Sequence, residues 1–249
     1  MNKDLANKTV LITGTSRGIG KAIAQAFLEQ GTKVIALYRE EKPEFEGSHE
    51  VIFLKADIQD LDTIRTWLSE FENDGGKIDV LVNNAGVYSK CDLLNVTEED
   101  FDRTMSINLK GTVFLSQLIA IHMKKNGSGS IVNAASFAAQ LASRGFGIYA
   151  ATKTAIISLT KSMAAEFAPY GIRVNAFSPG VTPTRMTQPA IDANEKGMLD
   201  TIALHRFGGA DEVANAVLFL ASDASSYITG TNLDVSGGKF ANQNPGASW

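Results

Sequence analysis

The chain has 249 residues, 44% of them hydrophobic, and a formal net charge of −4, which suits one large apolar core and offers no basic surface for nucleic acid. No apolar run reaches the ~20 residues that a membrane helix needs, the first eight residues are mostly polar, and the single Cys91 cannot form an internal disulfide. These features exclude nucleic-acid-binding and membrane-spanning classes and predict a soluble, cytoplasmic protein without a signal peptide.

The chain opens with a predicted strand, a glycine-rich loop and a helix. Residues 9–12 form a short apolar run, residues 21–30 have the periodicity of a helix that ends at Gly31, and residues 33–37 predict a second strand. The loop at residues 13–20 reads TGTSRGIG. Glycines let a backbone approach a pyrophosphate, whose charge binds to the N–H groups of a helix N-terminus. This order therefore predicts a dinucleotide-binding loop.

The rest of the chain alternates between predicted strands and helices, with no linker and no internal repeat. The strand segments are apolar throughout, which is typical of a parallel sheet covered on both faces. We therefore expect a single α/β domain over residues 1–249, built on a doubly wound, Rossmann-like parallel sheet of seven strands. The remaining strands are predicted at residues 51–54, 78–82, 131–134, 172–177 and 232–235, and the remaining helices at residues 61–72, 98–124, 147–167 and 211–221.

Polar or turn-forming motifs follow several of these strands. They are Asp57, residues 83–86 (NNAG), Ser136 and Pro179-Gly180. Ligands of doubly wound folds bind outside the carboxyl ends of the strands, so we expect these motifs to converge. Three of them also have a purely structural interpretation: a helix N-cap for Asp57, an ordinary turn for residues 83–86 and a loop breaker for Pro179-Gly180.

Tyr149 and Lys153 lie four residues apart in a predicted helix, and such positions share one face. A neighbouring ammonium favours the phenolate, so we expect Lys153 to lower the pKa of Tyr149 from its usual value of about 10. A tyrosine tuned in this way can exchange a proton with an alcohol or a carbonyl. This spacing also occurs by chance in helices, so the interpretation depends on the dinucleotide-binding loop.

The glycine loop has the spacing TGxxxGxG rather than GxGxxG. From about residue 8 to residue 238 the chain resembles the short-chain dehydrogenase/reductase family, and within it the compact branch of 3-oxoacyl-[acyl-carrier-protein] reductases. The resemblance implies hydride transfer between a nicotinamide cofactor and a ketone or secondary alcohol. The motifs that carry it are the glycine loop, residues 83–86, Asn108, Ser136, Tyr149, Lys153 and Pro179-Gly180.

The resemblance assigns catalysis to four residues. It implies that Ser136 donates a hydrogen bond to the substrate oxygen and that Tyr149 exchanges a proton with that oxygen. Lys153 then lowers the pKa of Tyr149 and binds the nicotinamide ribose. Asn108 lies inside a predicted helix, where Asn is not a favoured residue. The resemblance implies a kink there and a water that links Lys153 to solvent. The alternative is a polar side chain whose hydrogen bonds are satisfied within the protein.

The resemblance also implies a cofactor site. Relatives that bind NAD usually carry an acidic residue at the end of the second strand. Here Tyr38 and Arg39 take that position and Arg17 lies in the glycine loop, so we expect NADP, its 2′-phosphate bound by two guanidinium groups. Alternatively both arginines are solvated, and Glu40 or Glu41 binds a ribose. The implied cofactor residues are Gly14, Ser16, Arg17, Gly18, Ile19, Gly20, Tyr38, Arg39, Asp57, Ile58, Asn84, Ala85, Gly86, Tyr149, Lys153, Pro179, Gly180, Thr182 and Thr184.

Further expectations concern the substrate and partners. The resemblance implies a mobile substrate lid at about residues 185–207 and a homotetramer in which the helices at 98–124 and 147–167 pair across a two-fold axis. The three histidines show no metal-ligand spacing, so no metal is expected. We further expect the tail at residues 239–249 to dock through Trp249. The expected pocket wall is Tyr88, Phe137, Gln140, Leu141, Arg144 and Phe146.

Three alternatives stay open. A non-catalytic dinucleotide sensor would keep the glycine loop and lose the Ser-Tyr-Lys set, which is complete here. An epimerase of the extended branch would need a larger C-terminal domain. A carrier-protein reductase typically has an arginine before the fifth strand and another before the sixth, where this chain has Ser130 and Tyr170. We therefore expect a free carbonyl compound as substrate, although Lys124 and Lys125 could compensate.

Overall fold

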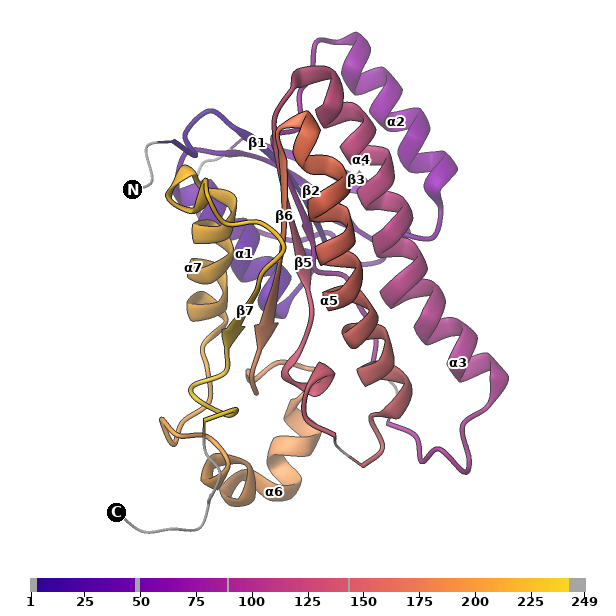
Figure 1. Cartoon of the computed structure of the whole chain (residues 1–249), viewed down its shortest axis with the longest axis vertical. Helices are drawn as coiled ribbons and strands as arrows, with labels where there is room; N and C mark the ends of the chain where they lie inside the picture. The colour runs from indigo at the N-terminus through magenta and orange to yellow at the C-terminus, as the bar shows by residue number, and fades with distance from the viewer. Residues whose placement is uncertain (1–3, 48–49, 89, 143, 242–249) are drawn as a thin grey trace.

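A parallel sheet of seven strands runs through the centre of the molecule (Figure 1). The computed structural model describes residues 4–47, 50–88, 90–142 and 144–241. The strand order β3-β2-β1-β4-β5-β6-β7 confirms the predicted doubly wound fold. The strands are β1 (Thr9–Thr13), β2 (Lys33–Tyr38), β3 (Val51–Lys55), β4 (Val80–Asn83), β5 (Gly129–Ala134), β6 (Ile172–Pro179) and β7 (Asn232–Val235).

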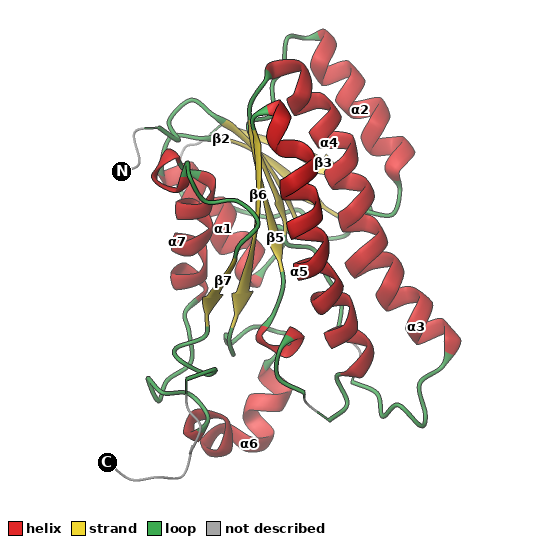
Figure 2. Ribbon diagram, viewed as in Figure 1, coloured by secondary structure: helices red, strands yellow, loops and turns green. Residues whose placement is uncertain are grey.

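Helices cover both faces of the sheet (Figure 2). One face packs against α2, α4 and α5, and the other against α1 and α7. In addition, α3 continues the line of α4, and α6 lies beyond the carboxyl ends of the strands (Figure 1). The helices are α1 (Gly18–Glu29), α2 (Leu61–Asn73), α3 (Glu98–Met105), α4 (Thr112–Asn126), α5 (Gly147–Phe167), α6 (Gln188–Asp200) and α7 (Ala210–Ala221).

Each strand supplies side chains to both cores, since successive residues of a strand point to opposite faces. In β1, Leu11 packs in the core beneath α2, α4 and α5. Its neighbours Val10 and Ile12 pack with α1 and α7. All three side chains are fully buried. Burial on both faces is the reason why the strand sequences do not alternate between apolar and polar residues.

The predicted helix at residues 98–124 is not continuous. It begins after Thr97, whose hydroxyl oxygen accepts the N–H of Asp100 at 3.1 Å, as expected for an N-cap. A π-helical turn, Ser106–Gly111, then separates α3 from α4. A Cβ on Gly111 would lie only 2.8 Å from the Ile58 side chain, so glycine allows this close approach. One extra residue per turn leaves almost no trace in apolar periodicity, so the periodicity predicts one long helix, and only the family resemblance implies a kink at Asn108 within this turn.

The segment predicted only as a lid contains a helix, α6. Its backbone departs from helical geometry at Asn194, with φ −160°. Among the described residues, no helix combines the length and apolar character needed to cross a membrane. Trp249 and most of the tail at residues 239–249 lie outside the described residues, so their docking stays an expectation.

Candidate active site

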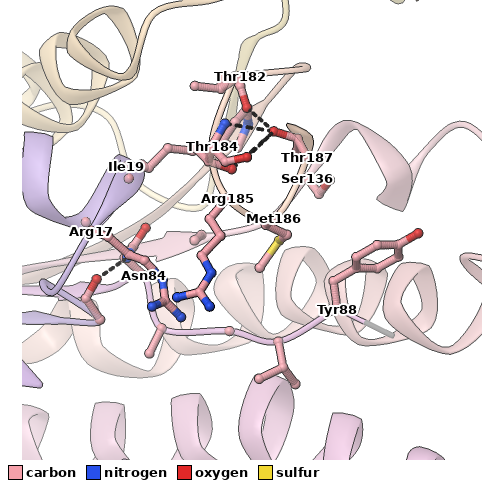
Figure 3. A pocket seen from close by; sticks show the side chains of 18 of the residues that line it. Arg17, Ile19, Asn84, Tyr88, Ser136, Thr182, Thr184, Arg185, Met186 and Thr187 are labelled. Carbon is pink, nitrogen blue, oxygen red and sulfur yellow. Dashed lines mark hydrogen bonds between the residues drawn. The ribbon is translucent and has the colours of Figure 1, made fainter. Parts of the chain in front are cut away.

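A pocket of ≈ 630 Å³ opens at the carboxyl ends of the strands, where the strand order reverses between β1 and β4 (Figure 3). All residues predicted to bind the cofactor line it, together with Ser136. Asn108 does not line the pocket and is 1% exposed. The fold thus brings motifs that are scattered along the sequence to one site.

The glycine loop between β1 and α1 leaves room for a phosphate group. Gly14 and Gly18 have φ of +72° and +55°, a region that L side chains rarely adopt. A Cβ on Gly20 would clash with the carbonyl oxygen of Gly14, so only glycine lets the helix start this close to the loop. The Arg17 side chain does not cap α1, and the first N–H groups of this helix remain available to an anion. This geometry fits the pyrophosphate of a dinucleotide.

Thr13 ties the glycine loop to the NNAG segment. Its hydroxyl oxygen accepts the backbone N–H groups of Asn84 at 3.0 Å and Ala85 at 2.9 Å. In return, the Asn84 side-chain amide donates to the carbonyl oxygens of Thr13 at 3.1 Å and Gly14 at 3.3 Å. Residues 83–86 therefore act as a brace for the loop rather than as an ordinary turn.

Tyr149 and Ser136 share a side-chain hydrogen bond within the pocket. The Ser136 Oγ also accepts the N–H of Ala138 at 3.2 Å, which fixes the serine side chain just after β5. Burial raises the pKa of Tyr149 above its usual value, and the hydrogen bond with Ser136 acts in the opposite direction. In this structure the pKa of Tyr149 is therefore raised overall, because desolvation of the phenolate outweighs the hydrogen bond, and a lowering effect of Lys153 stays a prediction.

Lys153 lies one helical turn from Tyr149, but its ammonium binds a backbone carbonyl. Nζ donates to the carbonyl oxygen of Ala134 at 2.7 Å and lies 5.7 Å from the centroid of the Tyr149 ring. Burial lowers the pKa of Lys153 to about 8. A Cβ on Gly86 would lie 3.6 Å from Nζ, so the glycine keeps this side of the amine clear. Lys153 can therefore gain or lose a proton close to neutral pH.

Asn108 is held inside the π-helical turn by the neighbouring backbone. Its Oδ1 accepts the N–H of Val87 at 2.8 Å, and its Nδ2 donates to the carbonyl oxygen of Val87 at 2.9 Å. The Asn108 backbone oxygen accepts the Thr112 hydroxyl at 2.9 Å. The helix is irregular where a kink is expected, while the side chain is also a satisfied polar group. The water relay remains a prediction.

One end of the pocket combines the two predicted arginines with three carboxylates. The Nη2 of Arg39 lies 2.6 Å from Glu40 Oε1, and its Nη1 lies 3.7 Å from Asp57 Oδ2. Arg17 Nη1 lies 3.6 Å from Glu41 Oε2. These side chains are partly exposed, and exposed ion pairs contribute only about 0–1 kcal/mol, so an incoming phosphate can replace them.

Aromatic rings line the other side of the pocket, next to Tyr149. Tyr88 stacks on Phe146 with ring centroids 4.8 Å apart and meets Tyr149 edge-on at 5.7 Å. Phe137, Met186 and Met198 add to this apolar wall. Among the described residues, the expected wall residues Gln140, Leu141 and Arg144 do not line the pocket.

Comparison with known proteins identifies the family. A family model described as enoyl-(acyl carrier protein) reductase matches residues 14–239. The 3-oxoacyl-[acyl-carrier-protein] reductase of Staphylococcus epidermidis is 38% identical over 242 residues, which cover 94% of this chain and 99% of that protein. The chain belongs to the short-chain dehydrogenase/reductase family. It is therefore an oxidoreductase, as the resemblance implies.

Two further members of the short-chain dehydrogenase/reductase family differ in cofactor and substrate. The NAD-dependent glycerol dehydrogenase of Listeria innocua is 39% identical over 241 residues, 94% of each chain. The structure of a gluconate 5-dehydrogenase from Burkholderia cenocepacia, in complex with NADP and tartrate, superposes with a TM-score of 0.89 at 32% identity over 96% of this chain and 98% of its own. Relatives of this short-chain dehydrogenase/reductase thus include enzymes named for polyol, sugar-acid and acyl substrates.

Some pocket residues of this short-chain dehydrogenase/reductase are not among those predicted. Arg103 and Ile107 lie four residues apart, so one face of the helix presents both to the pocket. Arg185 and Thr187 line it from the segment after β6. For Arg103 the helical spacing to Ile107 is a usable signal. For Arg185 the sequence offers its place next to Thr184 and at the start of the expected lid.

Proposed function

We propose that this short-chain dehydrogenase/reductase interconverts a ketone and a secondary alcohol with NADP(H), using Tyr149 as the acid/base. The observation that carries the proposal is the hydrogen-bonded pair of Tyr149 and Ser136 in one pocket with the glycine loop. The aromatic wall beside Tyr149 leaves an apolar space for the carbon skeleton of a substrate.

The proton steps follow from the two hydroxyl groups. In reduction, Ser136 donates a hydrogen bond to the carbonyl oxygen and Tyr149 transfers its proton to that oxygen; in oxidation, Tyr149 takes the proton of the alcohol. Burial keeps the pKa of Tyr149 high, so the phenol is protonated and ready to act as an acid. The bound nicotinamide supplies or accepts the hydride.

Lys153 and Asn108 support this chemistry. We assign the Lys153 ammonium to the ribose hydroxyls of the nicotinamide half and to stabilisation of the phenolate once Tyr149 has lost its proton. Asn108, held by Val87 and followed by an irregular turn, is assigned to the water that connects Lys153 to solvent. These roles rest on the family resemblance and on the positions of the side chains.

NADP is preferred over NAD in this proposal. Arg17 and Arg39 both line the pocket and present guanidinium groups that suit a 2′-phosphate. The NADP complex of the gluconate 5-dehydrogenase supports this choice. Glu40 and Glu41 are the residues that a NAD-binding alternative would use, and the NAD-dependent glycerol dehydrogenase is the relative that favours it.

The substrate is a free small carbonyl compound rather than a carrier-linked acyl group. The alternative, a 3-oxoacyl-[acyl-carrier-protein] reductase, is supported by the identity to the staphylococcal enzyme. The segment at residues 185–207 is assigned to a substrate lid, since Met186 and Met198 reach the aromatic wall from it.

A cytoplasmic homotetramer completes the proposal. Exposed apolar side chains on α4, Phe114 and Ile121, and exposed small residues on α5, such as Ala151, support pairing of these helices across a two-fold axis. Light scattering at micromolar concentration tests the assembly, and a monomeric mass would contradict it.

The test of activity is the consumption of NADPH over a panel of ketones, sugars, sugar acids and acyl thioesters. We expect turnover of at least one free ketone, lost in Tyr149→Phe. A purified protein that binds NADPH and turns over nothing on the panel would favour the sensor alternative.

A further inference from the structure

We propose that Arg185, the first residue of the lid segment, binds a phosphate group of the dinucleotide opposite Arg17. The inference rests on the proposed dinucleotide-binding function and adds a contact that joins the lid to the cofactor. The diphosphate bridge and the 2′-phosphate are both anions that a guanidinium can bind. Titration with NADPH and with NADH distinguishes them, because NADH lacks the 2′-phosphate.

The lid segment begins directly over the glycine loop. A Cβ on Gly18 would lie 3.3 Å from Thr184 Cγ2, so the residues next to Arg17 and Arg185 are almost in contact. In Figure 3, the Arg17 side chain comes from the glycine loop and the Arg185 side chain from the strand-end segment, and both extend into the pocket. An anion bound at the glycine loop would therefore have both guanidinium groups within the same part of the pocket.

The backbone that carries Arg185 is held in a tight turn. The Thr187 hydroxyl lies 2.5 Å from the carbonyl oxygen of Thr182 and accepts the N–H of Thr184 at 2.9 Å. The Thr184 and Thr187 hydroxyl oxygens are 3.1 Å apart (Figure 3). These bonds fix the direction in which Arg185 leaves the chain, while its exposed side chain remains free to reach a ligand.

Ion pairing within the pocket distinguishes Arg185 from Arg17 and Arg39. Arg17 is paired with Glu41, and Arg39 with Glu40. In the described part of the chain, Arg185 has no ion pair and no hydrogen bond from its guanidinium. Its charge is therefore uncompensated in the protein alone, and a bound phosphate would compensate it.

The neighbouring residue points to the substrate side. Met186 lies between Arg185 and Tyr88 in Figure 3, on the side of the aromatic wall. Two adjacent residues thus face different parts of the pocket: Arg185 faces the glycine loop, where the cofactor would bind, and Met186 faces the substrate space. Cofactor binding would in this way tie the start of the lid to the cofactor before the substrate is enclosed.

The test is a direct titration of the whole protein with NADPH and with NADH, without substrate. We expect Arg185→Gln to raise the Kd about tenfold, while Arg185→Lys, which keeps the charge, loses much less. Arg65→Gln is the matched control, because Arg65 is an exposed arginine paired with Asp62 on α2, away from the pocket. An equal loss with both dinucleotides assigns Arg185 to the diphosphate, and a loss confined to NADPH assigns it to the 2′-phosphate.

Added salt gives a second readout. The Kd of the wild type should rise more steeply with KCl than that of Arg185→Gln, because one charged contact is missing in the variant. An unchanged Kd in Arg185→Gln, or an equal loss in Arg185→Lys, overturns the inference. If the wild type binds neither dinucleotide, it is the proposed function that fails instead.

Discussion

The ammonium of Lys153 donates a 2.7 Å hydrogen bond to the carbonyl oxygen of Ala134, the last residue of β5. Lys153 is 5% exposed, and the contact is to a neutral group rather than to a carboxylate. Burial without a counter-charge is why the pKa of Lys153 falls from 10.5 to about 8. Keeping this amine charged therefore lowers the free energy of unfolding, and the size of this effect depends on pH.

Lys153→Met should change how stability responds to pH. Between pH 8 and 10.5 the unfolded wild type binds a proton at Lys153 that the folded state does not hold, so this group makes the wild type more stable as the pH rises. The methionine variant lacks this gain. Its stability relative to the wild type should therefore decrease by roughly 2 kcal/mol between about pH 7 and about pH 9.5, measured by urea unfolding. A difference that is constant over this range contradicts burial of a titrating amine.

Tyr149→Phe should abolish turnover and leave NADPH binding nearly unchanged. The substitution removes the hydroxyl that bonds Ser136 and keeps the ring that meets Tyr88 edge-on. Loss of a general acid typically lowers the rate by about 10²–10⁴-fold. Lys153→Ala should impair both turnover and binding. Tyr170→Phe, at an exposed tyrosine away from the pocket, is the control, and activity close to wild type in Tyr149→Phe would remove Tyr149 from the mechanism.

The order of elements and the cofactor side of the pocket were predictable because they follow from local patterns. Apolar runs mark the strands, and in a doubly wound fold the residues after them meet at one edge. Interactions that depend on distances across the fold were not predictable. The pKa of Tyr149 is raised although Lys153 lies one turn away, since burial depends on the whole pocket. The ion pair between Arg17 and Glu41 joins residues 24 positions apart that no motif links.

Gly20→Ala should destabilise the protein and abolish dinucleotide binding. A Cβ at this position would clash with the backbone carbonyl of Gly14, and backbone atoms cannot move aside cheaply. We expect a loss of about 2–3 kcal/mol in the free energy of unfolding. Gly208→Ala is the control, because its Cβ would make an ordinary 3.7 Å contact with the Thr182 hydroxyl oxygen. Equal stability of the two variants would argue against the close approach at the glycine loop.

Arg39→Ala should reduce kcat/KM for NADPH about tenfold or more and leave the value for NADH nearly constant. The guanidinium can contact a phosphate that NADH lacks, and a charge-assisted hydrogen bond contributes about 1.5–3 kcal/mol. Its present partners, Glu40 and Asp57, are partly exposed and compete weakly. Comparable or better kcat/KM with NADH in the wild type would refute NADP as the preferred cofactor.

The positions that would hold an acidic carrier protein carry little free positive charge in this chain. Ser130 is buried in β5, and Tyr170 is exposed. The Lys124 ammonium lies 4.1 Å from the centroid of the Tyr170 ring, and Lys125 pairs with Glu72 at 2.9 Å. The two lysines are therefore already engaged within the chain, and a net charge of −4 does not attract an acidic partner.

The location of these positions adds a second argument. Ser130 and Tyr170 lie at the amino ends of β5 and β6, whereas the pocket opens at the carboxyl ends of the strands. Within one chain they are at the wrong edge of the sheet, so they could only serve the pocket of a neighbouring copy. We therefore expect weak or no turnover of acetoacetyl-carrier protein and better turnover of a free ketone, in assays run side by side with NADPH. Efficient reduction of the carrier-linked substrate, lost in the double variant Lys124→Ala/Lys125→Ala, would reverse this assignment and make the chain a carrier-protein reductase that binds its partner through a different set of cations.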